Sequence, residues 1–313
     1  MAAGWPGVKE GQVASGDQGL LQNLLAAEWI VDGLYRAGMK TFKASDFVDA
    51  GFPTDTYSQL KAVYENENGH LRVFEDAIAS TNIKPGRCQY LYGFEDIKNR
   101  TLQVQKYMVI VSEIEIGSMA YLTGLAQQAE SAETLATIMG TISAETRHLT
   151  FVNGQVLRIG SFVGPTDTVY PWPLQILSTT KQLIVPGSCP KQNPEYPSPD
   201  QKLPKLSLNT SASDIKRANG TMNIAFAKPS GGDLPPLQRS SPEASNLHAI
   251  FFNSLFNYTV KASFLEDGSI FVNMPTLTAN NGNLLVAIAN TSNVRSKEDI
   301  VAGPLQVQLG AVS

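Results

Sequence analysis

Hydrophobic residues recur with one spacing in the first half of the chain and with another in the second. From residue 17 to about 160 they follow the i, i+3, i+4 spacing of helices, in long stretches with capping signals. Beyond residue 204 the apolar runs are short, and turn signals such as PSGGD, EDGS and NNGN separate several of them. The pattern predicts an α+β multidomain fold, a four-helix bundle followed by a C-terminal antiparallel β-sandwich.

Six prolines between residues 186 and 204 separate the two patterns. Proline cannot continue a helix, so this segment is expected to be an extended linker. The chain has 313 residues, of which 42% are hydrophobic, and this is enough for two domains with cores of their own. We therefore expect an N-terminal tail over 1–14, a helical bundle over 15–185, a Pro-rich linker over 186–204 and the β-sandwich over 205–313.

Acidic and histidine side chains interrupt the apolar face of each predicted long helix. In chain order these residues are Glu28, then Glu67 with His70, then Glu115, then Glu145 with His148. Two residues three apart on a helix lie close to the same face and about 4.5 Å apart along the axis, so each Glu-x-x-His pair can bind one centre. On the third helix, Glu113 lies on a neighbouring face and is the alternative to Glu115.

Buried carboxylates in this number need positive charge nearby. One unpaired carboxylate in an apolar interior costs several kcal/mol, and four together repel one another. Two divalent cations would balance the four glutamates, with both histidines neutral. A Glu from each of two helices and a Glu-x-x-His from each of the other two is the ligand pattern of ferritin-like dinuclear carboxylate bundles. Oxygen-rich ligation with two imidazoles suits iron or manganese, with zinc as a further option. A metal-free network of protonated Glu and His is the alternative.

Several short motifs carry a resemblance to a known family. They are LLAAEW in the first helix, the two Glu-x-x-His pairs, RCQY and EIGSMAY around the third helix, and QLIVPGSCP after the bundle. The chain resembles the fungal secreted ferritin-like proteins of the stress-response and desiccation-related group, over residues 15–195 and more loosely in the β domain. Its metal-ligand pattern is similar to that of manganese catalases and rubrerythrins.

This resemblance implies a metal-dependent oxidoreductase whose small-molecule partner is dioxygen, peroxide or another oxidant or substrate. In a catalase-like version, Glu145 would act as a catalytic base instead of a ligand. One position departs from the family pattern, because Ile114 stands where a Glu is expected three residues before the Gly of Gly-x-x-Ala-Tyr. The third-helix ligand is therefore open between Glu113 and Glu115.

Cysteines and sequons favour an oxidising, extracellular setting. The only two cysteines, Cys88 and Cys189, could pair across a loop of about 100 residues, and two free thiols are the alternative. Asn-x-Ser/Thr sequons for glycosylation begin at Asn99, Asn209, Asn219, Asn257 and Asn290. The first residues, MAAGWPGVKEG, lack the charged and apolar regions of a signal peptide, so such a peptide is either absent or already removed. The sequons and the cysteine pair favour removal, and we therefore expect a secreted protein.

Charge and hydropathy limit the partners. The net charge is −4 and no basic stripe is present, which argues against nucleic acid. No apolar run reaches the roughly 20 residues that span a bilayer. A homodimer is a further option for the partner.

Two further functions stay open. One is a metal-binding stress protein without turnover, and the other is a surface or glycan-interaction protein with a metal-free bundle.

Overall fold

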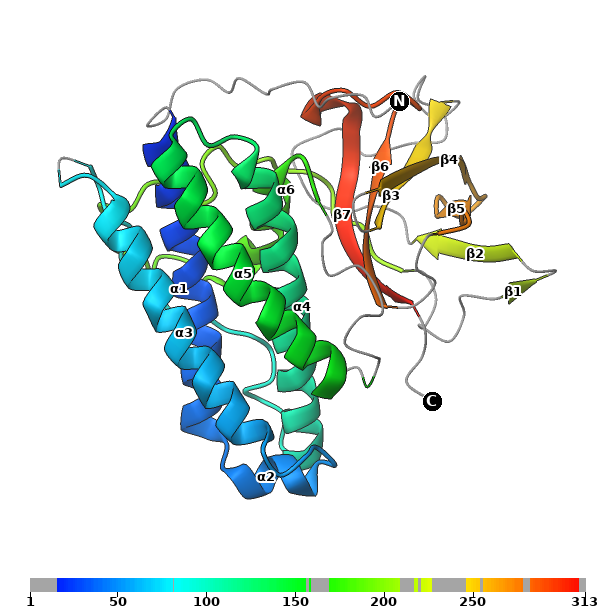
Figure 1. Cartoon of the computed structure of the whole chain (residues 1–313). Coiled ribbons are helices and arrows are strands. Elements are labelled where there is room, and N and C mark those ends of the chain that lie inside the picture. The colour runs from blue at the N-terminus through cyan, green and yellow to red at the C-terminus, as the bar shows by residue number, and fades with distance from the viewer. Residues whose placement is uncertain are drawn as a thin grey trace.

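The computed structural model describes most of the chain. The described residues are 16–80, 82–155, 158, 169–208, 217–218, 221–226, 246–253, 256–277 and 282–309. Within them, helices occupy the N-terminal part and strands the C-terminal part (Figure 1). The expected tail over 1–14 lies outside the described residues, as do the sequons at Asn209 and Asn219.

Four long helices form the bundle. They are α1 (Asp17–Thr41), α3 (Thr56–Ala77), α4 (Arg100–Ala126) and α5 (Ala132–Gln155). Helix α1 packs on α3 and α4 packs on α5, and the two pairs pack together (Figure 1). The short α2 (Ala44–Asp49) lies across one end of the bundle, and α6 (Pro173–Thr180) with the 3-10 turn η1 (Lys181–Leu183) packs on α4.

Local signals in the sequence set the helix starts. The Asn99 side chain accepts a hydrogen bond from the Leu102 backbone N–H and caps α4. The Ser131 hydroxyl accepts one from the Thr134 N–H at the start of α5. Pro173 is the first residue of α6, where its missing N–H removes no helical bond.

Helix α4 is the one helix in the described part of the chain that is long and apolar enough to cross a membrane. Yet 72% of its most apolar stretch is buried inside the protein, as expected for the central helix of a bundle. The described residues therefore contain no clear transmembrane span.

The strands form one curled antiparallel sheet. They are β1 (Arg217–Ala218), β2 (Thr221–Phe226), β3 (His248–Asn253), β4 (Phe256–Phe264), β5 (Ile270–Asn273), β6 (Gly282–Ala289) and β7 (Ile300–Leu309), with a 3-10 turn, η4 (Lys297–Asp299), before the last. Their order is β1-β2-β5-β4-β3-β6-β7. Strand β4 pairs with β3 up to Lys261 and with β5 from Ala262, so the sheet changes direction there.

The change of partner in β4 divides the sheet into two arms, one with β1, β2 and β5 and the other with β3, β6 and β7. The two arms enclose a single apolar cluster. It takes Phe226 and Val272 from one arm and Phe251, Val286 and Val307 from the other. A helical bundle followed by an antiparallel β domain is therefore the fold, as predicted. The two layers expected of the sandwich are the arms of one continuous sheet.

The β domain packs directly on the bundle. Phe252 of β3 contacts the rings of Tyr170 and Trp172 edge to face, at centroid distances of 4.8 and 6.3 Å. One apolar cluster continues from the helices through these rings into β3, β6 and β7. The segment between the two is held on the bundle as well, because Asn23 of α1 exchanges two hydrogen bonds with the Ser198 backbone.

A disulfide joins Cys88, before α4, to Cys189, after η1. The predicted pairing is confirmed. An antiparallel bridge between Tyr90 and Ile184 lies beside it, so the loop before α4 and the segment after η1 are fixed to each other.

Candidate metal centre

Six polar side chains converge in the middle of the bundle, between two apolar clusters. One cluster contains Leu24, Phe74 and Leu122, and the other contains Leu34 and Val104. The six residues are Glu28 on α1, Glu67 and His70 on α3, Glu115 on α4, and Glu145 and His148 on α5. All are buried, with at most 8% of their surface exposed. The helices thus bring together every residue of the predicted ligand set.

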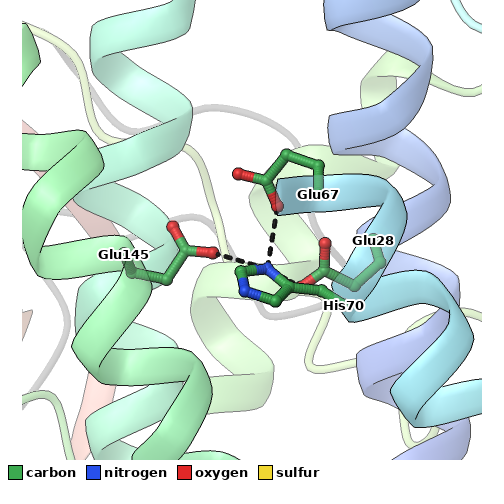
Figure 2. Close-up of side chains that lie close together, drawn as sticks. All are labelled: Glu28, Glu67, His70 and Glu145. Atoms are coloured by element: carbon green, nitrogen blue, oxygen red, sulfur yellow. Dashed lines mark hydrogen bonds and ion pairs between the residues drawn. The ribbon is translucent and has the colours of Figure 1, made fainter. Parts of the chain in front are cut away.

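The first half of the cluster surrounds His70. Its Nδ1 lies 3.0 Å from Glu67 Oε2, 3.2 Å from Glu145 Oε1 and 3.9 Å from Glu28 Oε1 (Figure 2). In Figure 2 the three carboxylates approach the imidazole from three different helices. Their ligand atoms all lie within 4.8 Å of one another, close enough for one metal ion.

The second half surrounds His148 in the same way. Its Nδ1 lies 2.9 Å from Glu67 Oε1, 3.4 Å from Glu115 Oε2 and 3.6 Å from Glu145 Oε2. Glu67 and Glu145 therefore each turn one oxygen toward His70 and the other toward His148. The two halves share these two carboxylates, and each half could hold a metal ion.

The structure separates the two candidate glutamates of α4. Glu115 is 1% exposed, lies in the cluster and accepts a hydrogen bond from the Tyr35 hydroxyl at Oε1. Glu113 is exposed on the outer side of α4. Two residues that are two positions apart on a helix point about 200° apart around its axis. Only one of Glu113 and Glu115 can therefore face the interior. The contact of Tyr35 with the cluster could not be predicted from the sequence, because a Tyr on an apolar stripe is typical of packing.

The carboxylates differ in how readily they ionise. Burial raises the pKa of Glu28 well above its usual range, and the neighbouring Glu67 raises it further. Burial and Glu145 raise the pKa of Glu115 to about 8. Burial also acts to raise the pKa of Glu145, but the two neighbouring imidazoles outweigh it and lower the pKa to about 2. Without metal, Glu28 and Glu115 therefore hold protons at neutral pH.

Burial acts in the opposite direction on the imidazoles, but their carboxylate neighbours outweigh it. Burial acts to lower the pKa of His70, but its contacts with Glu145 and Glu67 outweigh burial and raise the pKa to about 11. The pKa of His148 is also raised, because its contacts with Glu115, Glu145 and Glu67 outweigh the effect of burial. The carboxylates around each imidazole thus stabilise a positive charge at that position.

Five possible ligand atoms in the cluster have no hydrogen-bond partner among the described residues. They are Glu28 Oε2, Glu67 Oε1, Glu115 Oε2, His148 Nε2 and His148 Nδ1. The last atom lies 2.9 Å from Glu67 Oε1, but the direction of approach does not suit a hydrogen bond. A buried polar atom left unpaired costs about 1–3 kcal/mol. Divalent cations would satisfy the three carboxylate oxygens and Nδ1 at once, so the residues present fit divalent metal ions.

The remaining sequence-level candidates lie apart from this cluster. Asn99 and Asn257 are exposed and Asn290 is half-buried, which places three sequons within reach of solvent. His248, the third histidine, begins β3 and contacts the Asn246 carbonyl through Nδ1. In the described part of the chain, the bundle interior is the one place where carboxylates and imidazoles gather at metal-binding distance.

The fold and the cluster together define a class, the four-helix carboxylate bundles with Glu and Glu-x-x-His ligands. Residues 16–157 match the family described as Ferritin-like domain, and this part of the chain is a ferritin-like domain. The predicted ferritin-like fold is therefore confirmed. A comparison with curated proteins finds no match. The narrower resemblance to fungal secreted stress-response proteins stays a prediction.

Proposed function

We propose that the protein binds two divalent ions, iron or manganese, in the bundle and uses them as an oxidoreductase that acts with dioxygen or peroxide. One observation carries the proposal: Glu67 and Glu145 each turn one oxygen toward each histidine, while five atoms of the cluster that could bind metal have no hydrogen-bond partner among the described residues. Glu67 and Glu145 would be shared ligands. Glu28 with His70 would complete one position, and Glu115 with His148 the other.

Bound iron or manganese would supply the redox chemistry and Lewis acidity that protein side chains lack. The chain's own residues would set the conditions for it. Apolar clusters on both sides of the centre exclude bulk water. The Tyr35 hydroxyl holds Oε1 of Glu115, so that Oε2 points toward His148. Both oxygens of Glu145 face imidazoles, which favours a ligand over a free catalytic base.

The setting we propose is extracellular. The disulfide between Cys88 and Cys189 is compatible with an oxidising compartment. The exposed sequons at Asn99 and Asn257 can carry glycans without disturbing a core.

A second candidate function has its own support. Raised pKa values keep both imidazoles protonated without metal, and protons on Glu28 and Glu115 remove two negative charges. The bundle could therefore be a metal-free support for a β domain that binds a glycan or a protein surface.

Metal analysis separates these candidates. Protein purified without chelator, or loaded with iron or manganese after dialysis, should contain close to two ions per chain by mass spectrometry. Glu115→Gln should reduce this content by at least half, whereas Glu113→Gln, the matched change on the outer face of α4, should leave it unchanged. A metal-free protein after loading, or equal loss in both variants, would reject the dinuclear centre.

Turnover is a separate measurement. The loaded wild-type protein should consume peroxide or dioxygen, and Glu115→Gln should do so at least tenfold more slowly. Full metal occupancy with no consumption of either oxidant would instead assign the protein to metal binding without catalysis.

A further inference from the structure

A cleft of about 780 Å³ lies where the β domain meets the bundle. Its walls come from α1 and α4, from α6 and the segment that follows it to residue 206, and from β7. Figure 1 shows β7 running alongside the α4–α6 side of the bundle. Cavities of roughly 300–1,000 Å³ at domain interfaces are typical of small-molecule sites. None of the six residues of the metal centre lines this cleft.

The cleft is apolar inside and positively charged at its edge. Its floor is built from aliphatic side chains, among them Ile30, Val31, Ile110, Ile114, Ile176 and Leu177. Its charged lining residues are four lysines and two acids, namely Lys106, Lys181, Lys202, Lys205, Glu113 and Asp200. Lys181 is paired with Asp200, whereas Lys205 donates to the neutral Gln182 amide at 2.5 Å. Lys181 also lies 3.9 Å from Glu195, whereas Lys205 forms no ion pair within the described residues, so the edge keeps the positive charge of Lys205.

Two helices that carry residues of the metal centre also line the cleft. Val31 lines the cleft one turn after Glu28, and Ser118 lines it one turn after Glu115. Tyr121 also lines it, and its hydroxyl is buried without a hydrogen-bond partner. This hydroxyl is close enough to Glu28 and Glu145 for their charges to raise its pKa, after burial, which acts most strongly.

We propose that this cleft binds an organic carboxylate with an extended apolar body, of the medium-chain fatty acid class. The aliphatic floor would bury the chain, and the lysines at the edge would attract the carboxylate. The site is distinct from the metal centre, and its existence does not require that the centre hold metal. A ligand bound there would lie next to Tyr121.

Calorimetric titration of the full chain with decanoate tests the proposal. Saturable binding with one decanoate per chain is expected, together with at least tenfold weaker binding of decyltrimethylammonium, which has the same chain and the opposite charge. No saturable decanoate binding, or equal binding of the two probes, would overturn it.

A glycine in the wall provides the blocking variant. A Cβ built on Gly117 would meet only Ile176 Cγ2, at 4.0 Å, so a larger side chain can enter the cleft without a clash at that atom. Gly117→Leu should weaken decanoate binding at least tenfold. Gly140→Leu is the matched control, because that glycine is exposed on α5 and a Cβ there meets nothing within 4 Å. Equal decanoate affinity in the two variants would place the binding elsewhere.

A surface variant covers the case in which Gly117→Leu fails to fold. Lys205→Gln removes an exposed positive charge at the edge and should weaken decanoate binding about threefold while leaving decyltrimethylammonium unaffected. An unchanged decanoate affinity would reject the charge argument. Metal content measured on the same samples should match wild type, so failure of the cleft and failure of the metal centre are distinguishable.

Discussion

The hydroxyl of Tyr35 donates a hydrogen bond to the Glu115 carboxylate inside the bundle. Removing it in Tyr35→Phe leaves a buried carboxylate oxygen unpaired, and hydrogen bonds to charged groups contribute about 1.5–3 kcal/mol. We expect manganese affinity to fall about tenfold, as measured by competition with a metal-sensitive dye.

Tyr107 offers the matched control for this change. It is equally buried, but its hydroxyl has no hydrogen-bond partner. Tyr107→Phe should therefore leave manganese affinity within about twofold of wild type and leave the free energy of unfolding unchanged or slightly higher. A similar loss of affinity in both variants would mean that Tyr35 acts through packing.

Metal binding should release protons and strengthen with pH. His70 has a pKa raised to about 11 and Glu115 one raised to about 8, so both groups carry protons in the metal-free protein at pH 7. A cation must displace these protons, and binding is therefore favoured as pH rises from 6 to 8. Calorimetry in two buffers of different ionisation enthalpy measures the release directly, and zero net proton release would contradict these pKa directions.

Individual ligands could be recognised from the sequence because a charge on an apolar stripe conflicts with its surroundings. Glu67 with His70, and Glu145 with His148, are conspicuous for this reason. The spacing of the apolar stripe favoured Glu115, but Glu113 stayed open because both flank the position at which the family pattern has its Glu. The choice depends on the rotation of α4 within the bundle. Tyr35 was missed because an aromatic residue on the same stripe agrees with burial.

At the scale of the element, the capping residue of α4 is also the first residue of a sequon. Asn99→Ala removes the hydrogen bond from the Leu102 N–H to Asn99 and should lower the free energy of unfolding by about 1 kcal/mol. Thr101→Ala is the control, because it destroys the same sequon but keeps the cap. The two variants are produced in a host that adds no glycans, and their free energies of unfolding are measured by urea denaturation. Equal stabilities would show that the cap contributes nothing.

The long helices followed directly from hydrophobic periodicity, but the shape of the sheet did not. Alternating residues predict that strands exist, whereas pairing depends on distant parts of the chain. Strand β4 illustrates this, since its first part pairs with β3 and its second part with β5. No residue in FNYTVKASF marks the point of change, so one curled sheet and two stacked sheets look alike in the sequence.

At the scale of the whole molecule, one covalent link ties two distant segments together. Cys88 and Cys189 are 101 residues apart, and in the chain-entropy model closing a loop of about 100 residues stabilises the native state by up to about 4.7 kcal/mol. The double variant Cys88→Ser/Cys189→Ser should lose about 3–5 kcal/mol of unfolding free energy in urea. Reductant should destabilise the wild type alone, and a response of the double variant to reductant would contradict this assignment.

The apolar cluster that runs from the helices into β3, β6 and β7 makes the two halves of the molecule depend on each other. If the two halves were separated, the rings of Phe252, Tyr170 and Trp172 would be exposed to solvent. Heating should therefore melt the bundle and the sheet in a single event, and a protease that nicks the connection between them should leave the fragments associated. The sheet covers apolar side chains of the bundle. A bundle produced without the sheet would expose them and would be prone to aggregation and degradation.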